Sequence, residues 1–185
     1  MLFRSVLMGK LNIPVIPPEE VAKLELSEFA RPRFEQAQQL APYGLPSNLD
    51  AWDGYPAARE RLFAMLSADA TNPISLAGDT HNGWAFNLTN SLGEAVGVEW
   101  GTPGVSSPGL ESYVPLPPEQ MQALLKGASP ELVACDTSQR GWTQVTLTPE
   151  AAIAQWRVVS SVMEPTYQAS DSEQLVTARN TRILS

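Results

Sequence analysis

A carboxylate and an imidazole stand two residues apart in the segment 76–84, Leu-Ala-Gly-Asp-Thr-His-Asn-Gly-Trp. A hydrophobic run, expected as a strand over residues 74–79, leads to this pair. Residues i and i+2 of an extended backbone point the same way, so we expect Asp79 and His81 to face one point at the strand end. A carboxylate oxygen and an imidazole nitrogen suit a transition metal, and the Asn82 amide could bind the metal or a phosphate oxygen.

The same residues also have a structural interpretation. An aspartate before a turn often accepts hydrogen bonds from nearby backbone N–H groups. A single histidine after a strand is often a hydrogen-bonded part of the fold. On the motif alone, the structural interpretation is the more frequent one.

Other catalytic patterns fail on spacing. The chain has no G-x-x-x-x-G-K-[ST] phosphate loop. Ser106 and Ser107 lack a G-x-S-x-G elbow, and His81 is the only histidine that could serve them as a base. Cys135, with Arg140 five residues on, does not fit a thiolate phosphatase loop, and we expect it to be a small strand hydrophobe. No catalytic residue is assigned beyond the metal-ligand candidates.

Composition excludes several partners. The 185 residues include 12 Lys and Arg against 20 Asp and Glu, a net charge of −8, which argues against nucleic-acid binding. An anionic membrane surface would repel such a chain, and no apolar run approaches the ~20 residues of a membrane-spanning helix. We see no signal peptide, so the sequence as given predicts a cytoplasmic chain. One cysteine excludes an internal disulfide or a thiolate zinc cage.

The elements that must position the pair follow from apolar periodicity and from Pro and Gly. We expect a single α/β region with a polar, frayed tail over residues 165–185. Helices are predicted over residues 18–28, 56–68 and 118–126, the last closed by Gly127. Arg59, Glu60 and Arg61 should be mostly solvated. Strands are predicted over residues 5–11, 74–79, 94–100, 132–135, 142–147 and 151–162, with the last two forming a hairpin.

Two further segments are distinctive. Residues 49–56, Leu-Asp-Ala-Trp-Asp-Gly-Tyr-Pro, place two carboxylates and two aromatics at a helix entry. Capping by Asp53 and aromatic packing is the preferred interpretation. Residues 101–109, Gly-Thr-Pro-Gly-Val-Ser-Ser-Pro-Gly, predict an ordered loop with three hydroxyl groups, and we expect it to approach Asp79.

Taken together, the chain resembles the PhoD-like phosphatases, the alkaline phosphatase D family of metallophosphoesterases. Residues 6–9, 49–56, 76–81 and 98–109 and the strand pair beginning at Arg140 carry the resemblance, in family order. The resemblance implies a calcineurin-like αββα sandwich, with a mixed sheet and flanking helices. It implies hydrolysis of phosphate mono- or diesters by metal-activated water, with iron and calcium as metals. It identifies Asp79 and His81 as the late metal-ligand pair. Asn82, by its residue type and place beside the pair, is the candidate substrate-binding residue.

The resemblance covers only the C-terminal half of such a domain. The early Asp-rich and Asn-bearing ligand motifs are not found before residue 49, so we expect the isolated chain to be inactive or nearly so. One alternative is a catalytically silent half-domain that pairs with the missing N-terminal half or another chain. A second alternative is a metal-binding module with no hydrolysis. Family members are often exported through a signal that would lie upstream.

A half-domain should lack cover on one sheet face. Seven apolar side chains should then be partly exposed, and the chain should self-associate as a homo-oligomer or be partly molten. They are Val6, Met8, Leu76, Val96, Val98, Val145 and Ile153.

Overall fold

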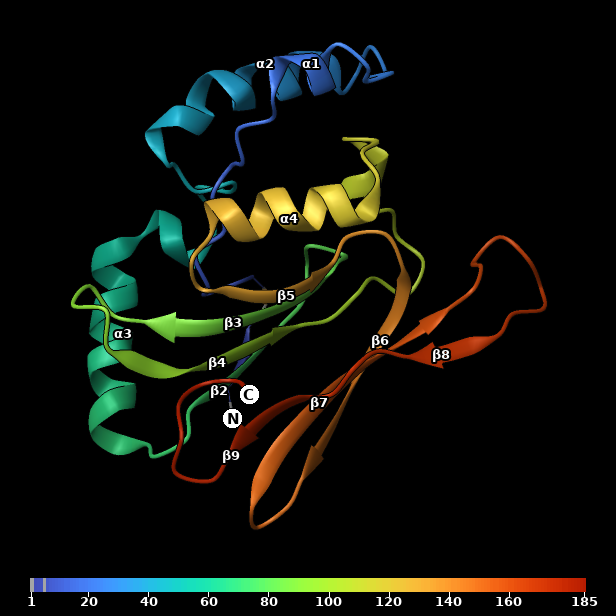
Figure 1. Cartoon of the computed structure of the whole chain (residues 1–185). Coiled ribbons are helices and arrows are strands. Elements are labelled where there is room, and N and C mark those ends of the chain that lie inside the picture. The colour runs from blue at the N-terminus through green and yellow to red at the C-terminus, as the bar shows by residue number, and fades with distance from the viewer. Residues whose placement is uncertain (1, 5) are drawn as a thin grey trace.

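A computed structural model describes residues 2–4 and 6–185, the first three as backbone alone. A five-stranded mixed sheet runs in the order β1-β2-β4-β3-β5 (Figure 1). Its strands are β1 Leu2–Arg4, β2 Ile74–Ala77, β3 Gly83–Thr89, β4 Ala95–Gly101 and β5 Leu132–Asp136. The first three strands of this order are parallel, whereas β3 runs antiparallel to both of its neighbours.

A second, antiparallel sheet is built around β7. Its strands are β6 Arg140–Leu147, β7 Ala151–Val159, β8 Ala169–Asp171 and β9 Leu175–Ala178. The predicted hairpin of the last two strands is confirmed as β6 and β7. The tail after residue 165 is not frayed, because β8 and β9 both pair with β7 and Leu184 packs into the core between the sheets.

Among the described residues, four α-helices complete the fold: α1 Pro18–Val21, α2 Arg31–Leu40, α3 Pro56–Asp69 and α4 Pro118–Ala128. Short 3-10 helices span Ala41–Tyr43, Trp52–Gly54 and Leu110–Ser112. Figure 1 shows α4 across one face of the five-stranded sheet, with α1 and α2 beyond it and the second sheet on the opposite face. No helix in the described part of the chain is long and apolar enough to span a bilayer.

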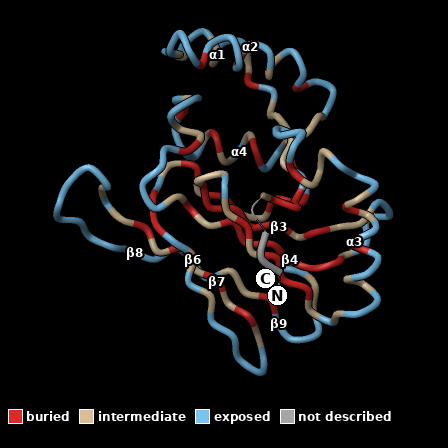
Figure 2. The backbone as a smooth tube through the Cα atoms, turned by 180° about the vertical axis from the view of Figure 1, so that it is seen from behind, coloured by how far each residue is buried: buried red, intermediate tan, exposed pale blue. Residues whose placement is uncertain are grey.

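The alternation of side chains along β3 explains the layers. Trp84, Phe86 and Leu88 are buried in the core that contains Phe63 of α3. Ala85, between them in sequence, belongs to the core shared with the second sheet. Consecutive strand residues point to opposite faces, so one strand supplies both cores. Figure 2 shows the buried backbone concentrated in these central strands.

The two sheets cover one another, which corrects the expectation of an uncovered face. Val98 and Trp100 of β4 pack with Trp156 and Val158 of β7. The prediction of partial exposure is wrong for Met8, Val96 and Val98, which are each 0% exposed. It is confirmed for four side chains of intermediate exposure, namely Val6, Leu76, Val145 and Ile153. This chain therefore carries strands of both sheets and buries a two-sided core of its own.

The segment after β1 forms a loop where a strand was predicted. The backbone N–H groups of Met8 and Gly9 donate to the Glu99 carboxylate, at 2.8–3.0 Å, instead of to a neighbouring strand. Gly9 also packs on the Phe86 ring, where an added Cβ would lie 2.3 Å from a ring carbon. The predicted strand over 5–11 is therefore wrong for residues 6–11, and residue 5 lies outside the described part.

A buried ion pair fastens α3 to this loop. The Arg59 guanidinium binds the Glu131 carboxylate at 2.7 Å and donates to the carbonyl oxygens of Met8 and Thr89. Arg59 is 1% exposed and stacks over the Phe63 ring. The prediction that Arg59 is solvated is wrong, because its guanidinium satisfies backbone carbonyls that the irregular loop leaves open.

Other boundaries also differ from prediction. The helix predicted over 18–28 ends at Val21, and the sequence analysis missed α2 and β3. Pro32 suits the start of α2, and only Phe34 of that helix is buried, so its apolar periodicity is weak. Gly127 lies inside α4, whose C-cap is Ser129.

Candidate functional site

The Asp79–His81 turn follows directly on β2, at the end where parallel strands of α/β sheets place their ligands. Both residues have left-handed backbones, with φ of 72° for Asp79 and 61° for His81. The extended geometry assumed from sequence is therefore wrong. Even so, both residues line one cavity, so a tight turn brings them to the same space.

Hydrogen bonds hold this strained turn in place. The Thr80 N–H donates to the carbonyl of Gly78, and the Trp84 indole N–H donates to the Thr80 hydroxyl at 2.7 Å. Left-handed backbones in residues other than glycine cost about 1–3 kcal/mol each and persist where the surroundings enforce them. Two such residues in one turn are a feature of functional sites.

The predicted approach of the 101–109 loop to this turn is confirmed. The Nδ1 atom of His81 lies 2.9 Å from the carbonyl oxygen of Pro108. A carbonyl oxygen can only accept, so in a neutral imidazole this contact places the proton on Nδ1 and leaves the lone pair on Nε2. Gly104 packs beside His81, since an added Cβ would lie 3.0 Å from the His81 Cβ. The loop thus leaves the imidazole in the tautomer that a metal ligand needs.

Arg140, at the start of β6, braces the turn from the second sheet. Its guanidinium donates to the His81 carbonyl at 3.1 Å and forms an ion pair with Glu111. Although burial alone would raise it, the hydrogen bonds from Arg140 and the Gly109 N–H hold the pKa of the Glu111 carboxyl below its usual range. Neither residue was predicted to contact the turn, because Arg140 lies 59 positions from His81 and 29 positions from Glu111 in the sequence.

Asn82 is 1% exposed and anchors the neighbouring loop. Its Oδ1 accepts a hydrogen bond from the Leu110 N–H at 3.0 Å, and Gly109 packs directly against its amide. Its Nδ2 is a buried donor for which the described residues offer no hydrogen-bond partner. Its contact with substrate, expected from the amide side chain beside Asp79 and His81, stays a prediction.

The distinctive segment 49–56 acts differently from the capping we expected. No side chain caps α3, and the Asp53 carboxylate instead accepts a hydrogen bond from the Leu11 N–H at 3.1 Å. Burial raises the pKa of Asp53 above its usual range. Asp53 therefore fixes Leu11, one of the residues that line the cavity.

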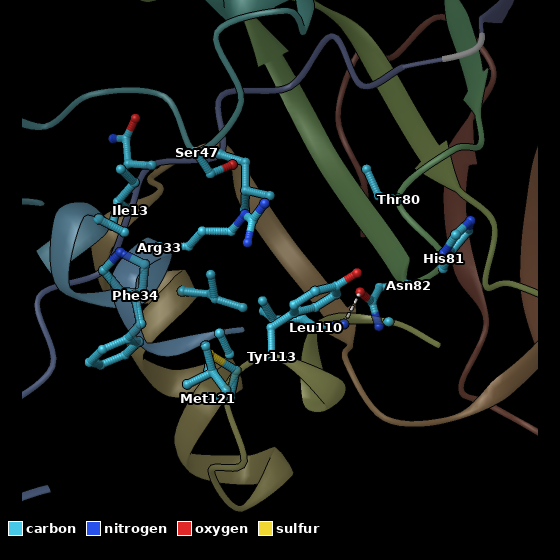
Figure 3. Close-up of a pocket in the computed structure, with 18 of the residues that line it drawn as sticks. Ile13, Arg33, Phe34, Ser47, Thr80, His81, Asn82, Leu110, Tyr113 and Met121 are labelled. Carbon is cyan, nitrogen blue, oxygen red and sulfur yellow. Dashed lines mark hydrogen bonds between the residues drawn. The ribbon is translucent and has the colours of Figure 1, made fainter. Parts of the chain in front are cut away.

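The cavity has a volume of about 530 Å³ and opens between the Asp79–His81 turn, the 108–114 segment, α2 and α4. Figure 3 shows Thr80, His81 and Asn82 on one side, Phe34 and Met121 on the other, and Tyr113 between them. The cavity therefore joins a polar end, which holds the metal-ligand candidates, to an apolar end.

Asp79 and His81 provide a carboxylate and an imidazole, which suit a metal ion, but they are only two ligands. Within the described residues, no group of three or more His, Cys, Asp or Glu side chains gathers to hold an ion. Cys135 is buried in the core, as predicted, and burial raises the pKa of its thiol to about 12. A thiolate at that position is therefore not available as a nucleophile.

Comparison with known proteins agrees with the sequence motifs. The family model described as "PhoD-like phosphatase" matches residues 5–156. "Alkaline phosphatase D" of Bacillus subtilis (strain 168) is 32% identical over 123 residues, which are 64% of this chain and 20% of that protein. The chain "Structure of PhoD" superposes with a TM-score of 0.66 at 21% identity, over 100% of this chain and 30% of that one.

This chain thus spans about a fifth to a third of the relatives it matches. The superposition bears out a mixed α/β fold with two sheets. The family model covers most of the described sequence, including the Asp79–His81 turn and the 101–109 loop. The chain belongs to the PhoD-like phosphatase family.

Proposed function

We propose that this chain supplies the late metal-ligand pair and the substrate-side loops of a phosphoric ester hydrolase. The observation that carries the proposal is the Asp79–His81 turn, whose two residues line one cavity and in which the His81 Nδ1 lies 2.9 Å from the Pro108 carbonyl oxygen. A carboxylate and an imidazole with a free Nε2 are ligands suited to iron, and a carboxylate also suits calcium. The fold that this role requires is the αββα metallophosphoesterase sandwich.

A metal held by Asp79 and His81 would polarise the phosphoryl group and lower the pKa of bound water. The chain's own residues perform the positioning. Pro108 fixes the imidazole tautomer, and Arg140 holds the His81 backbone. Asn82 holds the loop that closes the cavity at Leu110.

The site needs further ligands from outside this chain. Metal affinity depends on the number and preorganisation of ligands, and two are too few for a tight catalytic cluster. We propose that the rest of a PhoD-like domain, or a second chain, contributes them. Among the described strands, β1 ends the five-stranded sheet with a partner on one side only, which offers an edge for added strands.

Grafting tests this role. The chain replaces the matching segment of the Bacillus subtilis relative, and the chimera is assayed with 4-nitrophenyl phosphate, iron and calcium. We expect activity that His81→Ala or Asp79→Ala reduces by at least about 100-fold, because loss of a ligand should cost more than the roughly 10–100-fold lost with a residue that only supports a ligand. Asp69→Ala, at the exposed end of α3, is the matched control. A His81→Ala chimera with full activity would contradict the proposal.

The isolated chain provides the second arm of this test. We expect no turnover above that of its His81→Ala variant under the same conditions. Turnover comparable to an ordinary enzyme, abolished by His81→Ala, would show that two ligands suffice. The alternative function, a silent half-domain that serves as a binding partner, predicts instead that His81→Ala leaves the grafted enzyme unchanged.

A further inference from the structure

The cavity is much larger than a phosphate group requires. Its volume of about 530 Å³ falls in the range of roughly 300–1,000 Å³ typical of small-molecule sites. Four separate parts of the chain form its apolar wall, namely the 11–16 segment, α2, the 108–114 segment and α4. Representative side chains are Ile13, Phe34, Leu110, Tyr113, Met121 and Leu125.

The wall is apolar on the side away from the metal-ligand candidates. Phe34 and Met121 are 6% and 3% exposed, so they form a fixed floor. Tyr113 is 47% exposed and lies in Figure 3 between this floor and Asn82. Apolar surface that faces a cavity gains stability when an apolar ligand group removes it from water.

The apolar wall also contains a cation. Arg33 of α2 is exposed and lines the cavity, and Figure 3 shows its guanidinium directed into the space between Ser47 and Tyr113. One of its nitrogens donates to the Phe29 carbonyl, and the group stacks over the Phe29 ring at 4.1 Å. No carboxylate in the described part lies within ion-pair distance, so its other N–H groups are open to an anion.

We propose that this cavity binds phosphate esters of apolar alcohols, with the aromatic or aliphatic group on the Phe34–Met121 side. The phosphate would lie between Arg33 and the Asp79–His81 turn, both of which line the cavity. The chain carries a net charge of −8, so an unpaired guanidinium in the cavity is a local attraction for anions and not a general one. That the anionic group is a phosphate, and that it lies toward the turn, rests on the proposed function.

Calorimetry on the 185-residue chain without added metal compares 1-naphthyl phosphate, glycerol 1-phosphate and 1-naphthol. We expect 1-naphthyl phosphate to bind at least about tenfold more tightly than glycerol 1-phosphate, because a hydrophobic pocket discriminates by about that factor. It should also exceed 1-naphthol, which lacks the anion. Equal affinity for the two esters, equal affinity for naphthol, or no binding of any probe would each overturn the proposal.

Two exposed side chains allow variants that leave the core intact. Tyr113→Ala should weaken 1-naphthyl phosphate by about tenfold and leave glycerol 1-phosphate unchanged, since only the ring contact is lost. Arg33→Gln should weaken both esters by about tenfold and spare naphthol. The matched controls are Tyr43→Ala and Arg31→Gln, both exposed and outside the cavity wall. Controls that weaken binding as much as the test variants would overturn the assignment.

The same calorimetry with added Mn²⁺ distinguishes this proposal from the proposed function. Added Mn²⁺ should strengthen the binding of 1-naphthyl phosphate in the native chain but not in His81→Ala. If Mn²⁺ has no effect while the Tyr113→Ala and Arg33→Gln effects persist, the cavity proposal stands and the metal role fails. If Mn²⁺ strengthens both esters equally and Tyr113→Ala changes nothing, the metal role stands and the cavity proposal fails.

Discussion

Two groups of charged residues in this chain differ in almost every physical respect. The buried cluster of Arg59, Glu131 and Glu99 is 6% exposed or less at every member. The Asp79–His81 turn is at the surface of a cavity, with Asp79 exposed and His81 partly exposed. In the buried cluster, backbone and side chains occupy both oxygens of each carboxylate.

This difference in burial separates residues that stabilise the fold from residues that are available to bind a ligand. A buried charge whose partners all come from the chain has no capacity left for a ligand, and it fixes the loop at Met8 and Gly9. An exposed charge on a strained turn contributes little to stability, and its unused lone pairs and hydrogen-bonding positions are available to a ligand. Local sequence pattern did not distinguish the buried charged residues from the exposed ones.

Replacing the buried Arg59 should lower the unfolding free energy more than the other substitutions considered. Arg59→Leu leaves the buried Glu131 carboxylate with only the more distant Lys10 ammonium, at 3.9 Å, as a cation partner, which costs about 3–5 kcal/mol of unfolding free energy. Arg61→Leu, two residues away on an exposed face of α3, should change stability by less than about 0.5 kcal/mol. Urea denaturation measures both. Similar losses of unfolding free energy in the two variants would contradict the claim that the buried cluster stabilises the fold more than surface charges do.

The pH dependence of stability should report on Glu99. Burial raises the pKa of this carboxyl from 4.5 to about 7, although hydrogen bonds from Gly9, Ser75 and Met8 oppose the shift. Between these values the folded chain keeps a proton that the unfolded chain has lost. Stability from this group is therefore complete below pH 4.5 and is lost as the pH rises toward 7, by about 3 kcal/mol.

Glu99→Gln isolates that contribution. The glutamine Oε1 can accept from Met8 and Gly9 while its Nε2 donates to the Ser75 hydroxyl, so the fold should tolerate it. The difference in unfolding free energy between variant and native chain should then grow in favour of the variant from pH 4.5 to pH 7. A difference that stays constant over this range would mean that Glu99 does not titrate there.

Two glycines provide a smaller test within the site. Gly109 packs on Asn82, where an added Cβ would lie 2.4 Å from the amide nitrogen, whereas Gly127 in α4 meets nothing within 4 Å. Gly109→Ala should destabilise by about 1–3 kcal/mol through overpacking. Gly127→Ala should stabilise by about 0.5–1 kcal/mol through helix propensity. Thermal unfolding distinguishes the two, and equal effects would contradict the close packing of the 109 loop.

Local pattern predicted those elements whose signals are local. Pro56 and the apolar residues after it marked α3, and the alternation after residue 151 marked β7. The loop at Met8 escaped prediction because its hydrogen-bond acceptor, Glu99, lies 91 positions away. Arg59 was misjudged for the same reason, since its acceptors at Met8 and Glu131 are 51 and 72 positions distant.

The candidate site shows the same division. Asp79, His81 and the 101–109 loop stood out by residue type, and the structure brings them together. Arg33, Arg140 and Tyr113 carry no local signal, because only the packing of α2, β6 and the 108–114 segment brings them to the cavity or the turn. The prediction of an extended backbone at Asp79 and His81 was wrong because the sign of φ at residues other than glycine cannot be predicted from residue type.

The central claim is that Asp79 and His81 hold one metal ion together. His81 is the sole histidine, so its ring gives the only imidazole signals in an NMR spectrum of the untagged chain. Titration with paramagnetic Mn²⁺ should broaden these signals in the native chain, and Asp79→Asn should raise the Mn²⁺ concentration needed by about tenfold. Asp69→Asn should leave it unchanged. Imidazole signals that stay sharp, or that broaden identically in Asp79→Asn, would contradict a shared metal site.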